Sequence, residues 1–84
     1  MFKLGHCVIT PSAKAFLNGA SITPQELIRG HHDGSLWGKN KDQNERALTQ
    51  GDQIFSSTTV DGEIIFIITE ADRSSTCVLL ASDY

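Results

Sequence analysis

The sequence predicts an α+β fold, with short N-terminal helices packed on a three- to four-stranded antiparallel sheet that ends in a β-meander. Helix-start signals recur in the first half of the chain, whereas from residue 53 onward the pattern changes to the period of two that strands require. The chain has 84 residues, 39% of them hydrophobic, so we expect one domain, residues 1–84, with a modest core.

Two copies of the tripeptide Ile-Thr-Pro predict the starts of two short helices, at residues 11–18 and 24–29. In each copy threonine stands at the N-cap and proline at the first helical position, where its missing N–H group costs nothing. The second copy has a glutamate three residues after its threonine, so Thr23 and Glu26 predict a capping box. Gly30 stands where a glycine commonly ends a helix.

A third helix is expected over residues 43–50, with Asp42 as its N-cap and Gly51 at its end. Residues 30–41, between the second and third helices, are rich in glycine and predict an irregular loop. All three helices are short, so we expect packing against the sheet to hold them.

Three strands are expected in the second half of the chain, at residues 53–60, 63–69 and 76–81. Asp61-Gly62 is a strong hairpin signal between the first two. The middle strand is apolar at both odd and even positions from Ile64 to Ile68, which predicts a central strand covered on both faces. A short, partly apolar segment at residues 3–9 predicts an additional strand that would join this sheet.

The charged residues divide unevenly along the chain. Seven lysines and arginines against ten aspartates and glutamates give a net charge of −3, with +2 in residues 1–50 and −5 in residues 51–84. So few cations are a poor match for a phosphate backbone, and we do not expect a nucleic-acid partner. Two interpretations of the acidic half stay open: a solvated surface that keeps the domain soluble, or an acidic surface for a basic partner.

The sequence predicts neither export nor a membrane partner. The longest apolar stretch, Ile64–Ile68, is far too short to span a bilayer, and the apolar run near the N-terminus is shorter than the core of a signal peptide. Cys7 and Cys77 both lie in apolar runs, so we expect two reduced, buried thiols in a cytoplasmic protein.

Few residues are candidates for chemistry. His31 and His32 are adjacent and followed by Asp33, which would offer two imidazoles and a carboxylate to a metal ion. Because neighbouring side chains seldom point at one ion, a polar loop at a helix exit is the preferred interpretation. The run Gly34–Lys39 superficially resembles a phosphate-binding loop, but its glycine spacing is one residue short. We therefore expect no cofactor, no metal and no enzymatic activity.

Four residues are the candidates for a partner-binding surface: Trp37, Glu70, Asp72 and Arg73. The last three stand in a polar turn before the final strand, and binding residues concentrate in such turns. Their alternative role is to stabilise the turn through ion pairs or hydrogen bonds. Trp37 is the only tryptophan and would be an interface anchor, or else would pin the long loop to the core.

The segment from Ile67 to Thr76, with its block Thr-Glu-Ala-Asp-Arg-Ser-Ser-Thr, closely resembles the end of a family of small bacterial proteins carried on plasmids and other mobile elements. The resemblance covers nearly the whole chain, through the Val-Ile-Thr-Pro start, His32, Trp37-Gly38, Asn44, Ala47-Leu48, Gly51 and the terminal Asp83-Tyr84. The chain departs from the family at Leu36, where members carry aspartate, and around Ala81-Ser82, where they carry proline.

Members of that family are described as plasmid-related proteins or as subunits of a restriction methyltransferase. A methyltransferase needs a doubly wound, cofactor-binding sheet, which 84 residues without a glycine-rich strand-to-helix turn cannot supply. The resemblance therefore implies a setting on horizontally transferred DNA and no particular activity.

The sequence thus favours a small non-enzymatic binding protein, an accessory of a mobile element, with an unidentified protein partner. One alternative is an acidic decoy that occupies the nucleic-acid-binding surface of a host defence protein. Another is a small metal-binding protein or enzyme built on His31, His32 and Asp33. A homodimer also stays open, because a chain this small with a strand as apolar as Ile64–Ile68 would complete its core by pairing with itself.

Overall fold

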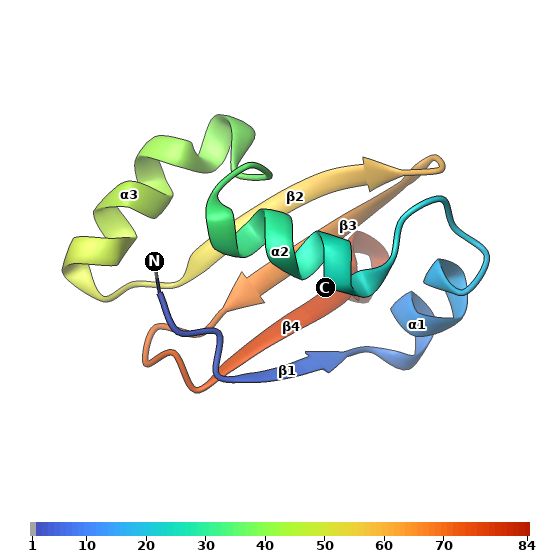
Figure 1. Ribbon diagram of the computed structural model, residues 1–84, viewed down its shortest axis with the longest axis horizontal. Coiled ribbons are helices and arrows are strands. Elements are labelled where there is room, and N and C mark those ends of the chain that lie inside the picture. The colour runs from blue at the N-terminus through green and yellow to red at the C-terminus, as the bar shows by residue number, and fades with distance from the viewer. Residues whose placement is uncertain (1) are drawn as a thin grey trace.

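The computed structural model describes residues 2–84 and shows a four-stranded sheet with helices packed on one of its faces (Figure 1). The strands, in the spatial order β1-β4-β3-β2, are β1 (His6–Ile9), β4 (Ser75–Leu80), β3 (Glu63–Thr69) and β2 (Ile54–Val60). Between β1 and β2 the chain forms α1 (Pro11–Leu17), α2 (Pro24–Asp33), the short 3-10 helix η1 (Gly38–Asn40) and α3 (Lys41–Gln50). A second 3-10 helix, η2 (Ala81–Asp83), follows β4.

The α+β class is confirmed, but the sheet is mixed rather than antiparallel. β2, β3 and β4 form the expected antiparallel meander, with Ile67 opposite Val78 across β3 and β4. β1 joins as the expected fourth strand, but it runs parallel to β4, with Ile9 beside Val78. The antiparallel prediction is wrong here because no hairpin joins these two strands. Three helices and two strands separate β1 from β4 along the chain, so no local turn dictates the direction of β1.

The predicted caps start α1 and α2, but α2 does not end where expected. Thr23 Oγ1 accepts the N–H of Glu26 at 3.2 Å, and Glu26 Oε1 accepts the N–H of Thr23 at 3.3 Å, which confirms the capping box. The helix then continues through Gly30 and stops at Gly34, whose φ of +88° is the left-handed conformation that glycine favours. A Cβ at Gly30 would lie 2.6 Å from Leu36 Cγ, so this glycine makes room for the returning chain instead of ending the helix.

The third helix also starts earlier than predicted. α3 begins at Lys41, with Asn40 rather than Asp42 in the N-cap position, because η1 leads directly into it. Its end is as expected, at Gly51. The loop predicted over residues 30–41 is therefore largely helical, and only the segment around Ser35 to Trp37 connects two helical elements.

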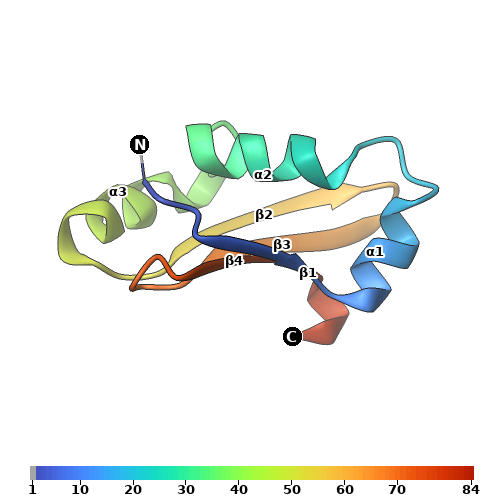
Figure 2. The ribbon, with the colours of Figure 1, turned by 60° about the horizontal axis from the view of Figure 1, so that its bottom comes forward.

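Two clusters of buried apolar side chains lie between the helices and the sheet, a larger one around Leu27 and a smaller one around Trp37. Among residues 2–84 no α-helix lies over the other face of the sheet (Figure 2). α2 and α3 lie on one side of the sheet, α1 lies beside β1 and β4, and η2 lies on the opposite side. Leu27 of α2 packs with Ile65, Ile67 and Val78, all of them fully buried. The prediction that β3 is covered on both faces is wrong only at Ile64, which is 48% exposed. On the same face Ile68 is 7% exposed and Phe66 is half-buried. Within residues 2–84 no helix is long and apolar enough to cross a membrane.

Candidate functional site

Trp37, a predicted interface residue, lies inside the molecule. Its side chain is only 4% exposed, and its indole Nε1–H donates to the carbonyl oxygen of His31 at 2.8 Å. Its ring stacks on that of Phe2, with 6.5 Å between ring centroids. The structure thus gives Trp37 the anchoring role, since it ties the segment after α2 back to the helix.

Arg73 stabilises the turn in which it stands. Its guanidinium donates to the carbonyl oxygens of Asp52, Glu70 and Ala71 at 2.7–3.1 Å, and to that of Ala47 near the end of α3 at 3.2 Å. The contacts with Glu70 and Ala71 lie within the β3–β4 turn, and those with Asp52 and Ala47 join this turn to the end of α3 and the segment that links α3 to β2. Because its donors are directed at backbone oxygens, the guanidinium is engaged within the molecule.

The two acidic candidates of the same turn differ from each other. Asp72 Oδ1 accepts the backbone N–H of Ser74 at 2.9 Å, and its hydrogen bonds with the side chain and backbone of Ser74 hold the pKa of Asp72 below its usual value. Glu70 is exposed, and its carboxylate accepts a 3.4 Å bond from Gln53 Nε2. Asp72 therefore shapes the turn, whereas Glu70 presents its charge to solvent.

His31 lies at the centre of a buried chain of hydrogen bonds. Its Nδ1 is 2.6 Å from Ser56 Oγ, and its Nε2 is 2.8 Å from Thr69 Oγ1. Thr69 Oγ1 is in turn 2.7 Å from Thr76 Oγ1, which donates to the carbonyl oxygen of Leu4. Each hydroxyl has one hydrogen, so Thr76 accepts from Thr69, Thr69 accepts from Nε2–H, and Ser56 donates to Nδ1. The chain of bonds thereby selects one neutral tautomer of His31.

The pairing of Ser56 with His31 does not make a catalytic dyad. Burial, and secondarily the charge of His32, lowers the pKa of His31 to about 4, so the ring stays neutral. Ser56 and His31 are both fully buried, and no substrate reaches the serine oxygen. Their role is to satisfy polar groups between α2 and the sheet, which is what buried polar side chains require.

The residues of the alternative metal site are separated by the fold. His31 points into the core, while the Nε2–H of His32 donates to the carbonyl oxygen of Phe2 at 2.9 Å. Asp33 Oδ1 accepts the N–H of Ser35 at 2.8 Å. In the described part of the chain, residues 2–84, no three side chains of histidine, cysteine, aspartate or glutamate gather closely enough to hold a metal ion.

The two cysteines are on neighbouring strands but on opposite faces of the sheet. In the register of β1 and β4, Cys7 lies beside Thr76 and Val8 lies beside Cys77, and both thiols are free. Cys7 is exposed, so the prediction of two buried thiols is wrong for this residue, because β1 is an edge strand. Cys77 is half-buried, and burial followed by the charge of Glu70 raises the pKa of its thiol.

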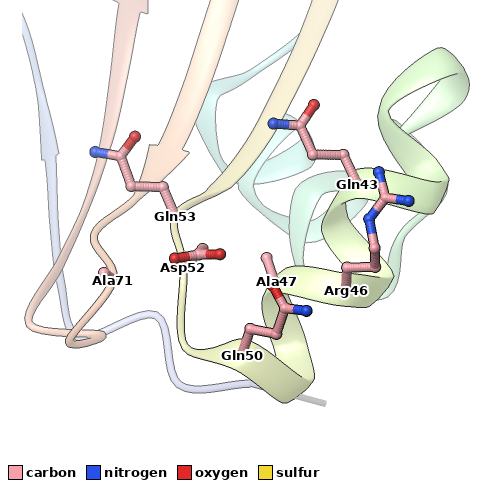
Figure 3. Close-up of a pocket in the computed structure, with 7 residues that line it drawn as sticks. All are labelled: Gln43, Arg46, Ala47, Gln50, Asp52, Gln53 and Ala71. Carbon is pink, nitrogen blue, oxygen red and sulfur yellow. The ribbon is translucent and has the colours of Figure 1, made fainter.

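A polar cavity of about 350 Å³ lies between α3 and the start of β2 (Figure 3). Seven residues line it: Gln43, Arg46, Ala47, Gln50, Asp52, Gln53 and Ala71. Side chains of α3 stand on one side and those of the segment leading into β2 on the other, next to the β3–β4 turn. The lining offers amides, one guanidinium and one carboxylate. It contains no hydroxyl, thiol or imidazole that could act as a nucleophile.

The strands of the sheet face opposite α2 carry seven apolar side chains, four polar ones and no aspartate, glutamate, lysine or arginine. Since side chains alternate across a strand, this surface, here called the open face, consists of His6, Val8, Phe55, Ser57, Thr59, Ile64, Phe66, Ile68, Ser75, Cys77 and Leu79. Val8 is 39% and Ile64 48% exposed. On this side of the sheet, residues 2–84 place η2 and no α-helix (Figure 2). The open face therefore leaves Val8 and Ile64 in contact with water, whereas Ile68 and Leu79 of the same face are 7% and 8% exposed.

An aromatic row crosses the open face. The ring centroids of Phe55 and Phe66 are 4.9 Å apart, and the ring of Tyr84 meets that of Phe66 edge-on at 5.7 Å. Tyr84 is itself 78% exposed. The carboxylate of Asp83 places η2 and this tyrosine over the sheet, because it accepts a hydrogen bond from Thr10 Oγ1 at 3.2 Å.

The residues of the open face were not among the predicted site residues. The signal was present, because the even-numbered positions of β3, Ile64, Phe66 and Ile68, are as apolar as the odd ones. A strand that is apolar at both even and odd positions is expected to be buried on both faces. The pattern does not show whether a second layer of the same chain covers the second face.

The acidic residues of the second half lie at both ends of the sheet. Asp61, Glu63 and Asp83 stand at the end where β2 leads into β3 and β4 leads into η2, whereas Asp52, Glu70 and Asp72 stand at the other end. The seven residues of β3 separate the two groups by about 23 Å. The acids do not form one continuous stripe, which is the arrangement that an imitation of a phosphate backbone requires.

Comparisons with protein-family models, with curated proteins and with solved structures found no match. The likeness to plasmid-borne proteins therefore stays a prediction. The open face, with the contacts of the predicted residues around it, is the basis for assigning a function.

Proposed function

We propose that this protein is a small non-enzymatic binding protein, an accessory of a mobile element, that docks a protein partner on its open face. The observation that supports this most directly is a mainly apolar sheet face, without aspartate, glutamate, lysine or arginine on its strands, on which Val8 and Ile64 are solvent-exposed. Apolar area in water costs about 25 cal/mol per Å², and contiguous patches of it on small proteins commonly mark interaction sites.

The composition of the open face also suits recognition. Phe55, Phe66 and Tyr84 form a continuous aromatic row. Aromatic side chains contribute strongly to interfaces because they bury a large area while few torsion angles are restricted. The tyrosine hydroxyl and the hydroxyls of Ser57 and Thr59 add hydrogen-bonding groups without adding charge.

The remaining surface supports a non-enzymatic role. The serine and histidine that lie within hydrogen-bonding distance are buried, and the polar cavity beside α3 has no hydroxyl, thiol or imidazole in its lining. Trp37 and Arg73, which the sequence suggested for partner binding, have their polar hydrogens directed at backbone oxygens. We therefore place the binding surface on the sheet and not on the β3–β4 turn.

Affinity capture from a lysate of the native host, read by mass spectrometry, tests this proposal. Three tagged proteins are compared: the wild type, Ile64→Lys on the open face, and Gln50→Lys on the exposed side of α3 as a charge-matched control. We expect a partner that the wild type and Gln50→Lys recover equally and that Ile64→Lys loses at least tenfold. Recovery that is the same for all three proteins would show that the open face is not the binding surface.

A further inference from the structure

We infer that the open face binds a second copy of this chain, so that two sheets pack face to face with their helices on the outside. The inference rests on the proposed function, because it names an occupant for the same surface. The face is mainly apolar, and two independent properties of it, its charge pattern and its area, favour this occupant.

Two copies of the open face can pack together without bringing like charges into contact. A two-fold axis places the same patch of both subunits in contact, so any charge near the axis would meet its own like charge. None of the strand positions on the open face is an aspartate, glutamate, lysine or arginine. A strongly charged partner would find no opposite charge within this contact.

The area of the face matches a weak dimer. Four strands about 4.8 Å apart and about 20 Å long form a flat face of roughly 400 Å². Part of this face is already covered within the chain, since Ile68 and Leu79 are 7% and 8% exposed. Two such faces therefore remove at most on the order of 1,000 Å² of accessible surface, which is near the lower limit for a specific interface. We therefore expect association in the micromolar range and exchange fast enough for another partner to compete for the same face.

Acidic residues at the rim supply a signature of this dimer. Glu70 follows β3 at one end of the open face, and Asp83 lies in η2 at the other end. If the two sheets align with the same ends together, Glu70 lies near Glu70 of the second copy and Asp83 near its Asp83. If they align with opposite ends together, Glu70 lies near Asp83 of the second copy. Salt screens such repulsion, so added salt should strengthen the dimer, whereas it would weaken a complex with a basic protein.

Sedimentation equilibrium of the untagged protein tests the inference, over concentrations from about 1 to 500 µM, which bracket a micromolar dissociation constant. We expect the dimer fraction to rise with concentration and to rise further between about 50 and 500 mM salt. Ile64→Lys should stay monomeric, and Gln50→Lys should associate as the wild type does. Circular dichroism and thermal melting establish that both variants fold, and Val8→Lys repeats the test at a second exposed position.

The two cysteines provide a second measurement with an internal control. Cys77 lies on the open face, while Cys7 points to the other side of β1 and is exposed. The rate of alkylation of Cys77 by excess iodoacetamide should fall severalfold as the protein concentration rises through the range of association. The rate for Cys7 should stay constant.

The results separate this inference from the proposed function. A monomer at every concentration, or a Cys77 rate that does not change while dimers form, overturns pairing through the open face. If the captured partner still depends on Ile64 in that case, the proposed function stands and only the second copy is excluded. If neither association nor capture depends on Ile64, both proposals fail.

Discussion

The side-chain amide of Asn44 makes two hydrogen bonds to the backbone of Phe55. Asn44 Nδ2 donates to the carbonyl oxygen of Phe55 at 2.7 Å, and Asn44 Oδ1 accepts the N–H of Phe55 at 3.0 Å. Asn44 lies in α3 and is 1% exposed, and Phe55 lies in β2, an edge strand of the sheet. The amide therefore takes the place of a neighbouring strand at this point of the edge. It also orients α3 on the sheet and leaves the ring of Phe55 for the open face.

Replacing Asn44 by alanine should lower the free energy of unfolding by about 1–3 kcal/mol, because one substitution removes two hydrogen bonds from a partly buried backbone. Urea unfolding followed by circular dichroism measures the change. Asn40→Ala is the matched control, since the side chain of Asn40 makes no capping bond to α3. Equal losses for both variants would contradict the role given to Asn44.

His31 should make stability depend on pH. Its pKa is about 4 in the folded protein and 6.5 when unperturbed, so the unfolded chain binds a proton at a pH where the folded one does not. Lowering the pH through 6.5 towards 4 therefore favours unfolding, and the stability lost is about 3 kcal/mol. Above pH 6.5 this contribution is fully present.

His31→Gln should remove that dependence between pH 6.5 and 4.5 in chemical unfolding, whatever its stability at neutral pH. His6→Gln, at an exposed position of β1, should keep the wild-type slope. A slope that His31→Gln leaves unchanged would assign the pH dependence to other groups. Titration of the His31 ring by NMR gives an independent value of its pKa.

Arg73→Lys should destabilise the protein by about 1–2 kcal/mol, because an ammonium cannot reproduce the fork of a guanidinium that binds several carbonyl oxygens. Ala47 O accepts the N–H groups of Gly51 and Asp52 as well as Arg73, so these two amides should exchange their hydrogens faster in the variant. Arg46→Lys, an exposed arginine of α3, is the control. Loss of partner capture in folded Arg73→Lys, with stability unchanged, would return the binding site to this turn.

Asp83→Ala should uncover more of the open face. The carboxylate accepts hydrogen bonds from Ser12 and Thr10, which hold the pKa of Asp83 below its usual value, and these bonds place η2 over the sheet. Without them Tyr84 should leave Phe66, and binding of a hydrophobic dye should increase. Asp42→Ala, at an exposed position of α3, should leave dye binding unchanged. Since the pKa is lowered, wild-type protein should keep η2 in place until the pH falls below the usual range of a carboxyl group.

The sequence predicted most elements because their signals are local. The capping box of Thr23 and Glu26 needs only residues three apart, and Asp61-Gly62 makes its hairpin whatever surrounds it. The errors arise where a distant residue decides. Gly30 would end a helix on propensity alone, but α2 continues to Asp33, and Leu36 comes so close to Gly30 that no larger residue would fit there. The direction of β1 depends on β4, nearly seventy residues away along the chain.

The candidate site was harder to predict than the fold for the same reason. Trp37 and Arg73 are residue types that are common at interfaces. Only the folded chain shows that Trp37 donates to a carbonyl oxygen of α2 and that Arg73 donates to carbonyl oxygens of α3 and of the neighbouring turns. His31 suggested a metal ligand, and only the fold shows that it joins two hydroxyls in the core.

By itself, then, the sequence determined an α+β chain with capped helices, a β-meander and an apolar strand from Ile64 to Ile68, since these follow from spacing along the backbone. The tertiary structure alone decided that α-helices cover one face of that strand, while within residues 2–84 the other face has only the short η2 and Tyr84 beside it. Burial of a strand face depends on which other segments pack against it. The apolar pattern of a strand shows that its faces favour burial, but it does not show which segment buries them. On the open face, no segment within residues 2–84 fully covers Val8 and Ile64.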